Sequence, residues 1–226
     1  ACISVCGNIK YDQPLEAMPG QYGQSLRRRL GLARKSLVIV AGSTHAGEDR
    51  SLVYAFSRLK RRFGDLKLII APRHLNRCPA IAAIAAALHL SCSELRDIEH
   101  PLKSGPGDVI IVNAMGLLRS FYAVADIAFV GGSLVNIGGH NPLEPAALGK
   151  PILFGPYMHK CKAVAEQLTA GGGARYIVNE NDLVMAAGDW LSDEPMRIRA
   201  GRHAGGVFSA NQGAVDKTIK AIESLI

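Results

Sequence analysis

The sequence predicts an α/β fold, a Rossmann-like parallel sheet flanked by helices. Three observations support this prediction. Short apolar runs rich in β-branched residues alternate with stretches whose apolar residues recur at helical spacing, which is typical of βα units. Hydrophobic residues make up 48% of the 226 residues, enough to bury a core and to exclude a disordered chain. Glycine or proline stands at several boundaries between these runs.

The expected strands and helices alternate from residue 36 onward. Residues 36–41 are the first strand, and the helix behind it has apolar residues at 52, 53, 56, 59 and 63. Later strands are expected at 67–71, 108–113, 126–130, 151–155 and 175–178. Later helices are expected at 79–90, 117–125, from Asn141-Pro142, at 160–170 and at 181–192, followed by a helical remainder. The last helix has an apolar face that must pack on another element, formed by Ala214, Val215, Ile219, Ile222 and Leu225.

Composition limits the classes of partner and compartment. Lys and Arg outnumber Asp and Glu by 26 to 19, a formal net charge of +7, which favours anionic partners. The least polar stretch, residues 78–90, is about 13 residues long, whereas a membrane-spanning helix needs about 20. The five cysteines form no C-x-x-C pair and indicate reduced, cytoplasmic thiols. The composition is that of a soluble globular protein. Because the chain starts without Met or a signal peptide, we expect a fragment of a longer protein.

Ligands of open α/β sheets bind at the carboxyl ends of the strands, and three loops there have unusual residues. The first, residues 42–48, matches half of a P-loop, but Glu48-Asp49 stands where Lys-Ser/Thr is required, so it is not a Walker A motif. Ser43 and Thr44 can still bind a phosphate, or one of them or His45 can cap the next helix. In the second loop, Arg73 and His74 directly follow a strand, and Arg73 either binds a phosphate or carboxylate or is a solvated surface residue.

The third loop is rich in glycine, with Gly131-Gly132-Ser133 followed by Gly138-Gly139-His140. These four glycines allow a ligand to approach the backbone closely. Asn141 as N-cap, Pro142 at the first helical position and Glu144 at the third fit a helix start whose amide groups attract an anion. Glu144 is either the reciprocal capping carboxylate or an acceptor for the two hydroxyls of a ribose.

Other chemistries lack their motifs. No G-x-G-x-x-G follows a strand, which disfavours a dinucleotide-binding dehydrogenase. The sequence also has no G-x-S-x-G elbow and no His and carboxylate cluster with metal-ligand spacing.

The ordered motifs at 42–48, 72–74, 129–133 and 138–147 together resemble the carboxyl-terminal half of 3-deoxy-D-manno-octulosonic acid (Kdo) transferase, a bacterial lipopolysaccharide enzyme. The resemblance runs from Gly7-Asn8-Ile9-Lys10 to Asn211-Gln212-Gly213-Ala214. It implies the C-terminal half of a GT-B glycosyltransferase, so that residues 1–226 form the domain that binds the sugar nucleotide CMP-Kdo. The reaction implied is the inverting, metal-independent transfer of Kdo to a lipid A precursor, without a cofactor.

The resemblance also implies which residues contact the donor. Phosphate or Kdo carboxylate contacts fall on the first and third loops and on Arg73, the ribose contact on Glu144, and the cytosine contact on Met115-Gly116. At the cytosine loop the chain departs from the family pattern, since Ala114 and Leu117 stand where acidic residues are common. The candidate donor-binding residues are Ser43, Thr44, Arg73, His74, Met115, Gly116, Gly132, Ser133, Asn141 and Glu144.

The resemblance places the catalytic base, the membrane anchor and the site for the lipid A precursor on an N-terminal half that this chain lacks. We therefore expect no catalytic residue here, and for the whole enzyme a location on the cytoplasmic face of the inner membrane of a Gram-negative bacterium. One alternative is a GT-B domain for another nucleotide sugar, such as a UDP-linked one. A second is a basic nucleic-acid-binding module, based on Arg27–Arg29, Arg34-Lys35 and Lys60–Arg62, although these runs lack interleaved stacking aromatics.

Overall fold

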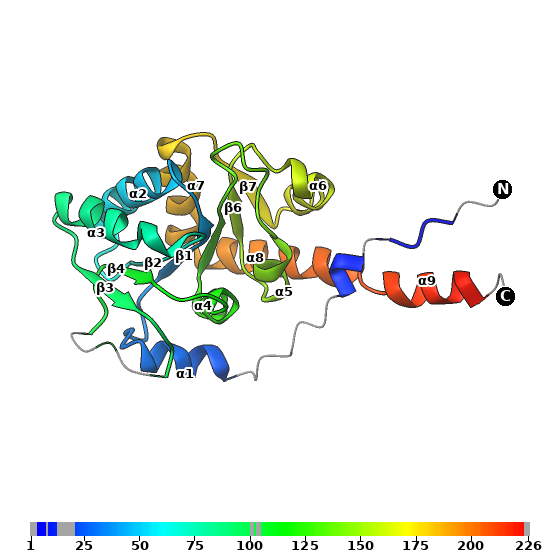
Figure 1. Cartoon of the computed structure of the whole chain (residues 1–226), viewed down its shortest axis with the longest axis horizontal. Helices are drawn as coiled ribbons and strands as arrows, with labels where there is room; N and C mark the ends of the chain where they lie inside the picture. The colour runs from blue at the N-terminus through cyan, green and yellow to red at the C-terminus, as the bar shows by residue number, and fades with distance from the viewer. Residues whose placement is uncertain (1–3, 8, 13–20, 100–101, 103–104, 224–226) are drawn as a thin grey trace.

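The described residues form one parallel seven-stranded sheet in the order β3-β4-β2-β1-β5-β6-β7 (Figure 1). A computed structural model describes residues 4–7, 9–12, 21–99, 102 and 105–223. All neighbouring strands pair in parallel, which confirms the predicted fold class. The strands are β1 (Val38–Thr44), β2 (Lys67–Pro72), β3 (Cys92–Leu95), β4 (Val109–Val112), β5 (Ile127–Val130), β6 (Ile152–Phe154) and β7 (Ala174–Tyr176).

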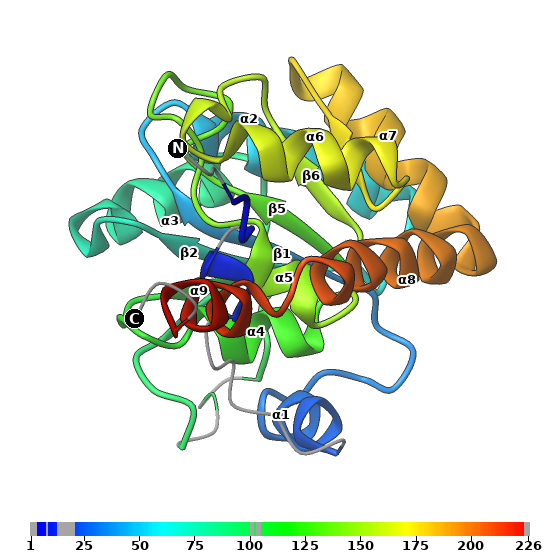
Figure 2. The same cartoon turned by 90° about the vertical axis from the view of Figure 1, so that its right-hand side faces the viewer.

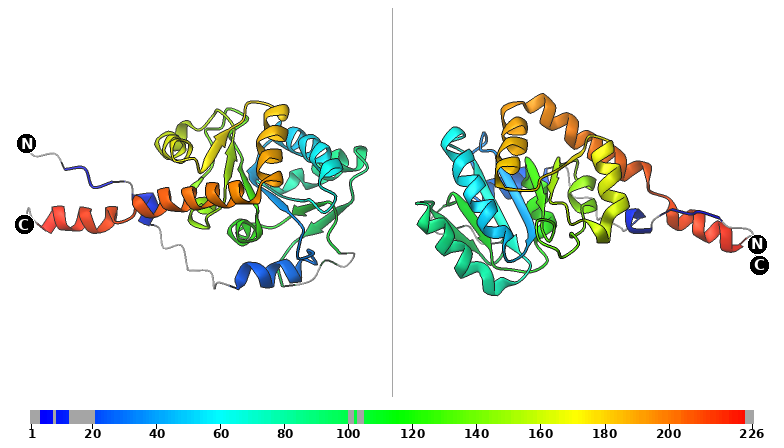
Figure 3. Two further views of the ribbon diagram at one scale, coloured as in Figure 1. Left: turned by 180° about the vertical axis from the view of Figure 1, so that it is seen from behind. Right: turned by 90° about the horizontal axis from the view of Figure 1, so that it is seen from above.

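Helices connect the strands and cover the sheet. The α-helices are α1 (Tyr22–Arg29), α2 (Glu48–Arg62), α3 (Cys78–Ala87), α4 (Leu118–Val124), α5 (Leu143–Ala147), α6 (Lys162–Ala170), α7 (Glu180–Ser192), α8 (Glu194–Ala210) and α9 (Ala214–Glu223). Short 3-10 turns are η1 (Ile9–Asp12), η2 (Leu75–Arg77) and η3 (His159–Cys161). Seen from behind, α8 runs across the molecule from α7 to its junction with α9 (Figure 3).

Strand side chains alternate between two buried layers, because successive residues of a strand point to opposite faces. Ile39 and Ala41 of β1 pack with α2, α3 and α7, whereas Val38 and Val40 pack with α1 and α4. Figure 2 shows the sheet between these two groups of helices. A third cluster joins β6 to α5, α6 and α8. Both faces are therefore covered, which explains the nearly unbroken apolar runs of the central strands.

Two elements have no counterpart in the sequence-based prediction. The edge strand β3 has the sequence Cys-Ser-Glu-Leu, of which only Leu95 is buried, so it has no apolar run to mark it. Helix α1 buries only Leu26 and otherwise looks like a charged segment in the sequence. Strand β1 also extends three residues beyond Ala41 to Thr44, so residues assigned to a loop continue the strand.

All strands are parallel, but the side on which new strands are added changes at β1, and this change places a crevice there. From β1 the chain builds outward through β2 on one side, and β5 then pairs with the other edge of β1. Loops that leave neighbouring strands in opposite directions open a crevice at the carboxyl ends, where α/β proteins bind ligands. At this point Gly131 passes so close to β1 that a Cβ on it would lie 2.3 Å from the Ser43 carbonyl oxygen.

The two ends of the described chain are joined to each other. The Asp12 carboxylate in η1 accepts hydrogen bonds from the backbone amides of Gly213 and Val215, at 2.5 and 2.6 Å. Helix α9 projects from the body beside the N-terminal segment (Figure 1). The expected packing of its apolar face is formed only at Ala214, which is buried, whereas Val215, Ile219 and Ile222 are exposed in the described chain.

Some expectations concern residues outside the described ranges. Ala1, Cys2 and Leu225 are among them. In the part of the chain that the structure describes, no helix is long and apolar enough to cross a membrane.

We expect Gly131→Ala to lower the free energy of unfolding by about 1–3 kcal/mol, because the added methyl would overlap the backbone of β1. Gly206→Ala is the matched control. A Cβ at Gly206 on α8 meets no atom within 4 Å, so this change should raise stability by about 0.5–1 kcal/mol. Urea unfolding of both variants measures the difference, and equal effects would contradict the close approach of the two loops.

Candidate functional site

The predicted loops do meet at one edge of the sheet, and Glu48 joins two of them. Its carboxylate is fully buried at the start of α2. Oε2 accepts hydrogen bonds from the amides of His45 at 2.9 Å and Gly132 at 2.7 Å. Oε1 accepts from the amides of Ser133 at 3.0 Å and Leu134 at 2.9 Å. Glu48, which in the sequence served only to exclude a Walker A motif, thus holds the loop after β1 against the loop after β5.

These bonds change the interpretation of three predicted donor contacts. The Gly132 and Ser133 amides already bind Glu48, and the Ser133 hydroxyl donates to the Val130 carbonyl and accepts from the Gly155 amide. Thr44 is also fully buried, and its hydroxyl has no hydrogen-bond partner. In this structure the three residues lie beneath the surface of the site, and Gly132 and Ser133 support it from below.

The four glycines make room for the protein's own atoms, contrary to the expectation that they admit a ligand. Besides Gly131, whose neighbour is β1, a Cβ on Gly132 would contact the His140 ring at 3.1 Å. At Gly138 it would overlap the side chains of His159 and Lys160, and at Gly139 the Met158 sulfur. The positive φ angles of Gly132, Gly138 and Gly139 also favour glycine. The glycine-rich loop is therefore packed tightly onto the segment that follows β6.

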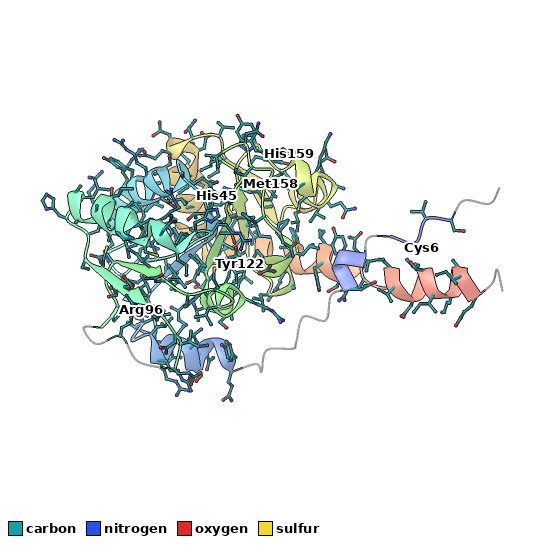
Figure 4. All side chains as sticks on the ribbon, viewed as in Figure 1. Cys6, His45, Arg96, Tyr122, Met158 and His159 are labelled. Carbon is teal, nitrogen blue, oxygen red and sulfur yellow. The ribbon has the colours of Figure 1, made fainter. Side chains whose placement is uncertain are left out.

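Three histidines gather above this packed loop. His45 Nε2 lies 2.8 Å from His140 Nε2, and the ring centroid of His74 lies 5.7 Å from that of His45. Figure 4 shows His45 on the same side of the molecule as Met158 and His159, with Tyr122 below. His45 and His140 are half-buried, and His74 is exposed. The rings come from three different strand ends, and only His74 was among the predicted site residues.

Positive charge surrounds the histidines. Burial, together with the fields of His45, Arg73 and Lys160, lowers the pKa of His140 to about 4. Burial also lowers the pKa of His45, against an opposing effect of Glu48. At neutral pH both rings are therefore uncharged, and the positive charge at this edge of the sheet is that of the neighbouring cations.

The two arginines after β2 have different surroundings. Arg77 Nε donates to Asp49 Oδ2 at 2.9 Å, and a second bond runs from Arg77 Nη2 to the same oxygen. Arg73 is exposed, and its backbone amide donates to the Thr44 carbonyl at 2.9 Å. Arg77 is thus committed to a buried carboxylate, whereas the Arg73 guanidinium faces solvent beside the histidines. Ser43, two residues before His45 in the chain, lies in a bulge of β1 with φ of 54°, a conformation uncommon outside glycine.

A half-buried carboxylate, Glu144, lies in the first turn of α5, after β5 and thus on the other side of β1 from Arg73. Burial raises the pKa of Glu144, against the field of Arg119. Its charge in turn acts on the Tyr122 phenol, which packs so closely on β1 that a Cβ on Gly42 would overlap it. Helix α5 begins at Leu143, one residue later than expected. The Asn141 side chain still lies at this helix start, where its Oδ1 accepts a hydrogen bond from the Leu143 amide at 3.1 Å. No hydrogen bond in the described chain joins Glu144 to the Asn141 amide, so the reciprocal capping role is not formed.

Two other predicted features lie in the open. Met115 is 57% exposed after β4, and Gly116 is exposed with φ of 81°.

Some side chains of the basic runs form contacts within the chain. Arg27 donates hydrogen bonds to the Ser36 and Val124 carbonyls, and Lys60 forms an ion pair with Asp108 at 2.8 Å. Within the described ranges, no group of three or more His, Cys, Asp or Glu side chains is arranged to hold a metal ion.

No family model matches the chain. It is 36% identical over 187 residues to the 3-deoxy-D-manno-octulosonic acid transferase of Aquifex aeolicus, covering 83% of this chain and 47% of that protein. It is 30% identical over 222 residues to the transferase of the same name from Haemophilus influenzae, covering 98% of this chain and 51% of that protein. By sequence, this chain is a relative of the Kdo transferases.

The structural comparison agrees. The chain is similar to the C-terminal CMP-Kdo binding domain of WaaA from Acinetobacter baumannii, with a TM-score of 0.74 at 24% identity, covering 83% of this chain and 96% of that domain. This likeness confirms the expected fold, a Rossmann-like parallel sheet flanked by helices. The chain spans about half the length of the two Kdo transferases it matches.

We expect Glu48→Gln to lower the free energy of unfolding by about 2–5 kcal/mol, because an amide NH₂ group would face backbone donors that need an acceptor. Glu166→Gln on α6 is the control, since its exposed carboxylate has only a 3.9 Å ion pair with Lys162, worth less than about 0.5 kcal/mol. Thermal and urea unfolding compare the two variants. Equal stability of both would show that the four amide bonds do not hold the loops.

Proposed function

We propose that this chain is the donor-binding half of an inverting, metal-independent glycosyltransferase that moves Kdo from CMP-Kdo to a lipid A precursor. The observation that carries the proposal is the pairing of a cationic group with a half-buried carboxylate across the crevice at β1. Arg73 and His74 follow β2, which pairs with one edge of β1, and Glu144 lies in the helix after β5, which pairs with the other edge. A nucleoside monophosphate ester has matching chemistry, with an anion at one end and ribose hydroxyls at the other.

Each part of the donor has a proposed partner at this edge of the sheet. Arg73 and His74, with Ser43 beside them, bind the phosphate or the Kdo carboxylate, since a guanidinium forms strong charge-assisted bonds to either anion. The Glu144 carboxylate accepts hydrogen bonds from the ribose hydroxyls, because it is not occupied by a hydrogen bond to the Asn141 amide. Asn141 helps to shape this side by fixing the start of α5. Met115 and Gly116 contact the cytosine from the exposed loop after β4.

The chemistry of the bond broken fits a site of this kind. When Kdo leaves CMP, negative charge develops on the phosphate, and fixed positive groups that face this charge lower the barrier. Arg73 is the residue we propose for that role. The general base that deprotonates the acceptor hydroxyl, the acceptor site and the membrane attachment belong, in this proposal, to an N-terminal half, and the whole enzyme acts at the cytoplasmic face of the inner membrane.

We expect the chain to bind CMP more tightly than UMP, with no loss of affinity in EDTA and no gain on adding Mg²⁺. Arg73→Ala and Glu144→Ala should each weaken CMP binding by about 10–100-fold, the range for loss of a hydrogen bond to a charged group. Calorimetric titration measures the affinities.

Arg61→Ala and Glu166→Ala are the charge-matched controls for these two variants, since both side chains are exposed on helices away from the crevice. Neither control should change CMP affinity by more than about twofold. A preference for UMP, a requirement for Mg²⁺, or equal effects of site and control variants would favour a different nucleotide sugar and contradict the proposal.

We also expect no Kdo transfer by this chain alone, since the proposed general base is not part of it. Incubation with CMP-Kdo and a lipid A precursor, followed by mass spectrometry of the lipid, tests this. A lipid heavier by one Kdo unit would show that the catalytic base lies within this chain.

A further inference from the structure

His45 and His140 belong to different loops, yet their side chains form one hydrogen-bonded unit. Their Nε2 atoms are 2.8 Å apart, their ring planes differ by 10° and their centroids are 5.1 Å apart. With the nitrogens this close and the centroids this distant, the rings lie end to end rather than face to face. One hydrogen fits between the two Nε2 atoms, so the Nδ1 atom of each ring is directed away from the other ring.

The groups that act on this pair are almost all cationic or neutral. They come from every segment packed around it: Arg73, His74 and Arg77 after β2, Lys160 in η3, and Glu48 at the start of α2. Among these described groups Glu48 is the only carboxylate, and its oxygens already accept four backbone amides. The Asp49 carboxylate offsets Arg77, so the excess of positive charge comes from Arg73 and Lys160. Burial, which is the larger cause, and this charge keep the pair neutral.

We propose that the His45–His140 pair takes up one proton from solvent when an anionic group of the donor binds beside Arg73. The inference rests on the proposed function and adds a proton to its binding step. In the neutral pair one Nδ1 is an N–H donor and the other is an acceptor, whereas after uptake both are donors and the pair carries a positive charge. A bound anion offsets the surrounding cations and attracts the protonated pair, so it lowers the electrostatic cost of that charge.

The direction of the pH effect follows from linkage. An anion that favours the protonated pair raises the pKa of the pair when it binds, so its affinity is highest at low pH and falls as pH rises through the pKa of the bound state. The slope approaches a tenfold loss of affinity per pH unit between the pKa values of the free and bound pair. Glu144 acts in the opposite direction, since ribose hydroxyls that bind its carboxylate favour release of a proton.

The experiment uses ligands whose charge is constant between about pH 5.5 and pH 7.5. Cytidine 5′-(methyl phosphate) is a phosphodiester with one negative charge, and free Kdo has the carboxylate without the phosphate. Calorimetric titration of the chain in two buffers of different ionisation enthalpy gives the affinity and the number of protons exchanged. We expect net proton uptake near pH 5.5 and tighter binding there than at pH 7.5. The ligand that shows uptake identifies which anion lies beside the pair.

Variants assign the proton to the pair. His140→Gln and His45→Gln keep a hydrogen-bonding side chain that does not titrate, so each should abolish the uptake and flatten the pH dependence. His203→Gln, at an exposed position on α8, is the control and should retain both. Thermal unfolding confirms that each variant is folded, and the wild-type measurement tests the proposal even where a variant is not.

The outcomes separate the inference from the proposed function. Binding of the cytidine ligand without proton uptake, or uptake unchanged in both histidine variants, would overturn the inference and leave CMP recognition in place. Failure of both ligands to bind at every pH would overturn the two proposals together.

Discussion

The buried carboxylate of Glu48 is the interaction on which the arrangement of the site depends. A buried charge is tolerated only when hydrogen bonds replace its lost hydration, and here four backbone amides do so. Those amides belong to loops more than 80 residues apart in sequence, so one side chain fixes the ends of β1 and β5 relative to each other. The tight approach of Gly131 to β1 has the same effect without charge.

This arrangement also determines how the site can recognise an anion. In a P-loop, backbone amides at the start of the helix bind the phosphate of the ligand. Here amides of comparable loops bind an internal carboxylate. In the proposed function, a substrate anion is recognised by side chains that are not part of this layer, namely the exposed Arg73 and its neighbouring histidines. The loop that resembles half of a P-loop thus serves as a base for the site.

The sequence predicted the strands that are buried on both faces, because their apolar runs leave no alternative. It missed β3 and α1, each of which buries a single residue, since such elements have no hydrophobic period. Arg73 could be selected because it directly follows a strand, and Glu144 because it stands in the first turn of a predicted helix. The role of Glu48 and the contact of His45 with His140 could not be predicted, because both depend on β1 and β5 being neighbours. Local hydrophobic periodicity does not determine the order of strands in a sheet.

In the proposed transferase, recognition of the anion by side chains instead of backbone amides has a physical consequence. Backbone amides carry a fixed dipole at all pH values, whereas an imidazole pair changes charge in response to its surroundings. In a site whose charge follows that of the ligand, part of the positive field exists only while the anion is bound. The empty site then avoids a concentration of like charges around Arg73, Lys160 and the histidines, which would otherwise weaken the packing that Glu48 maintains.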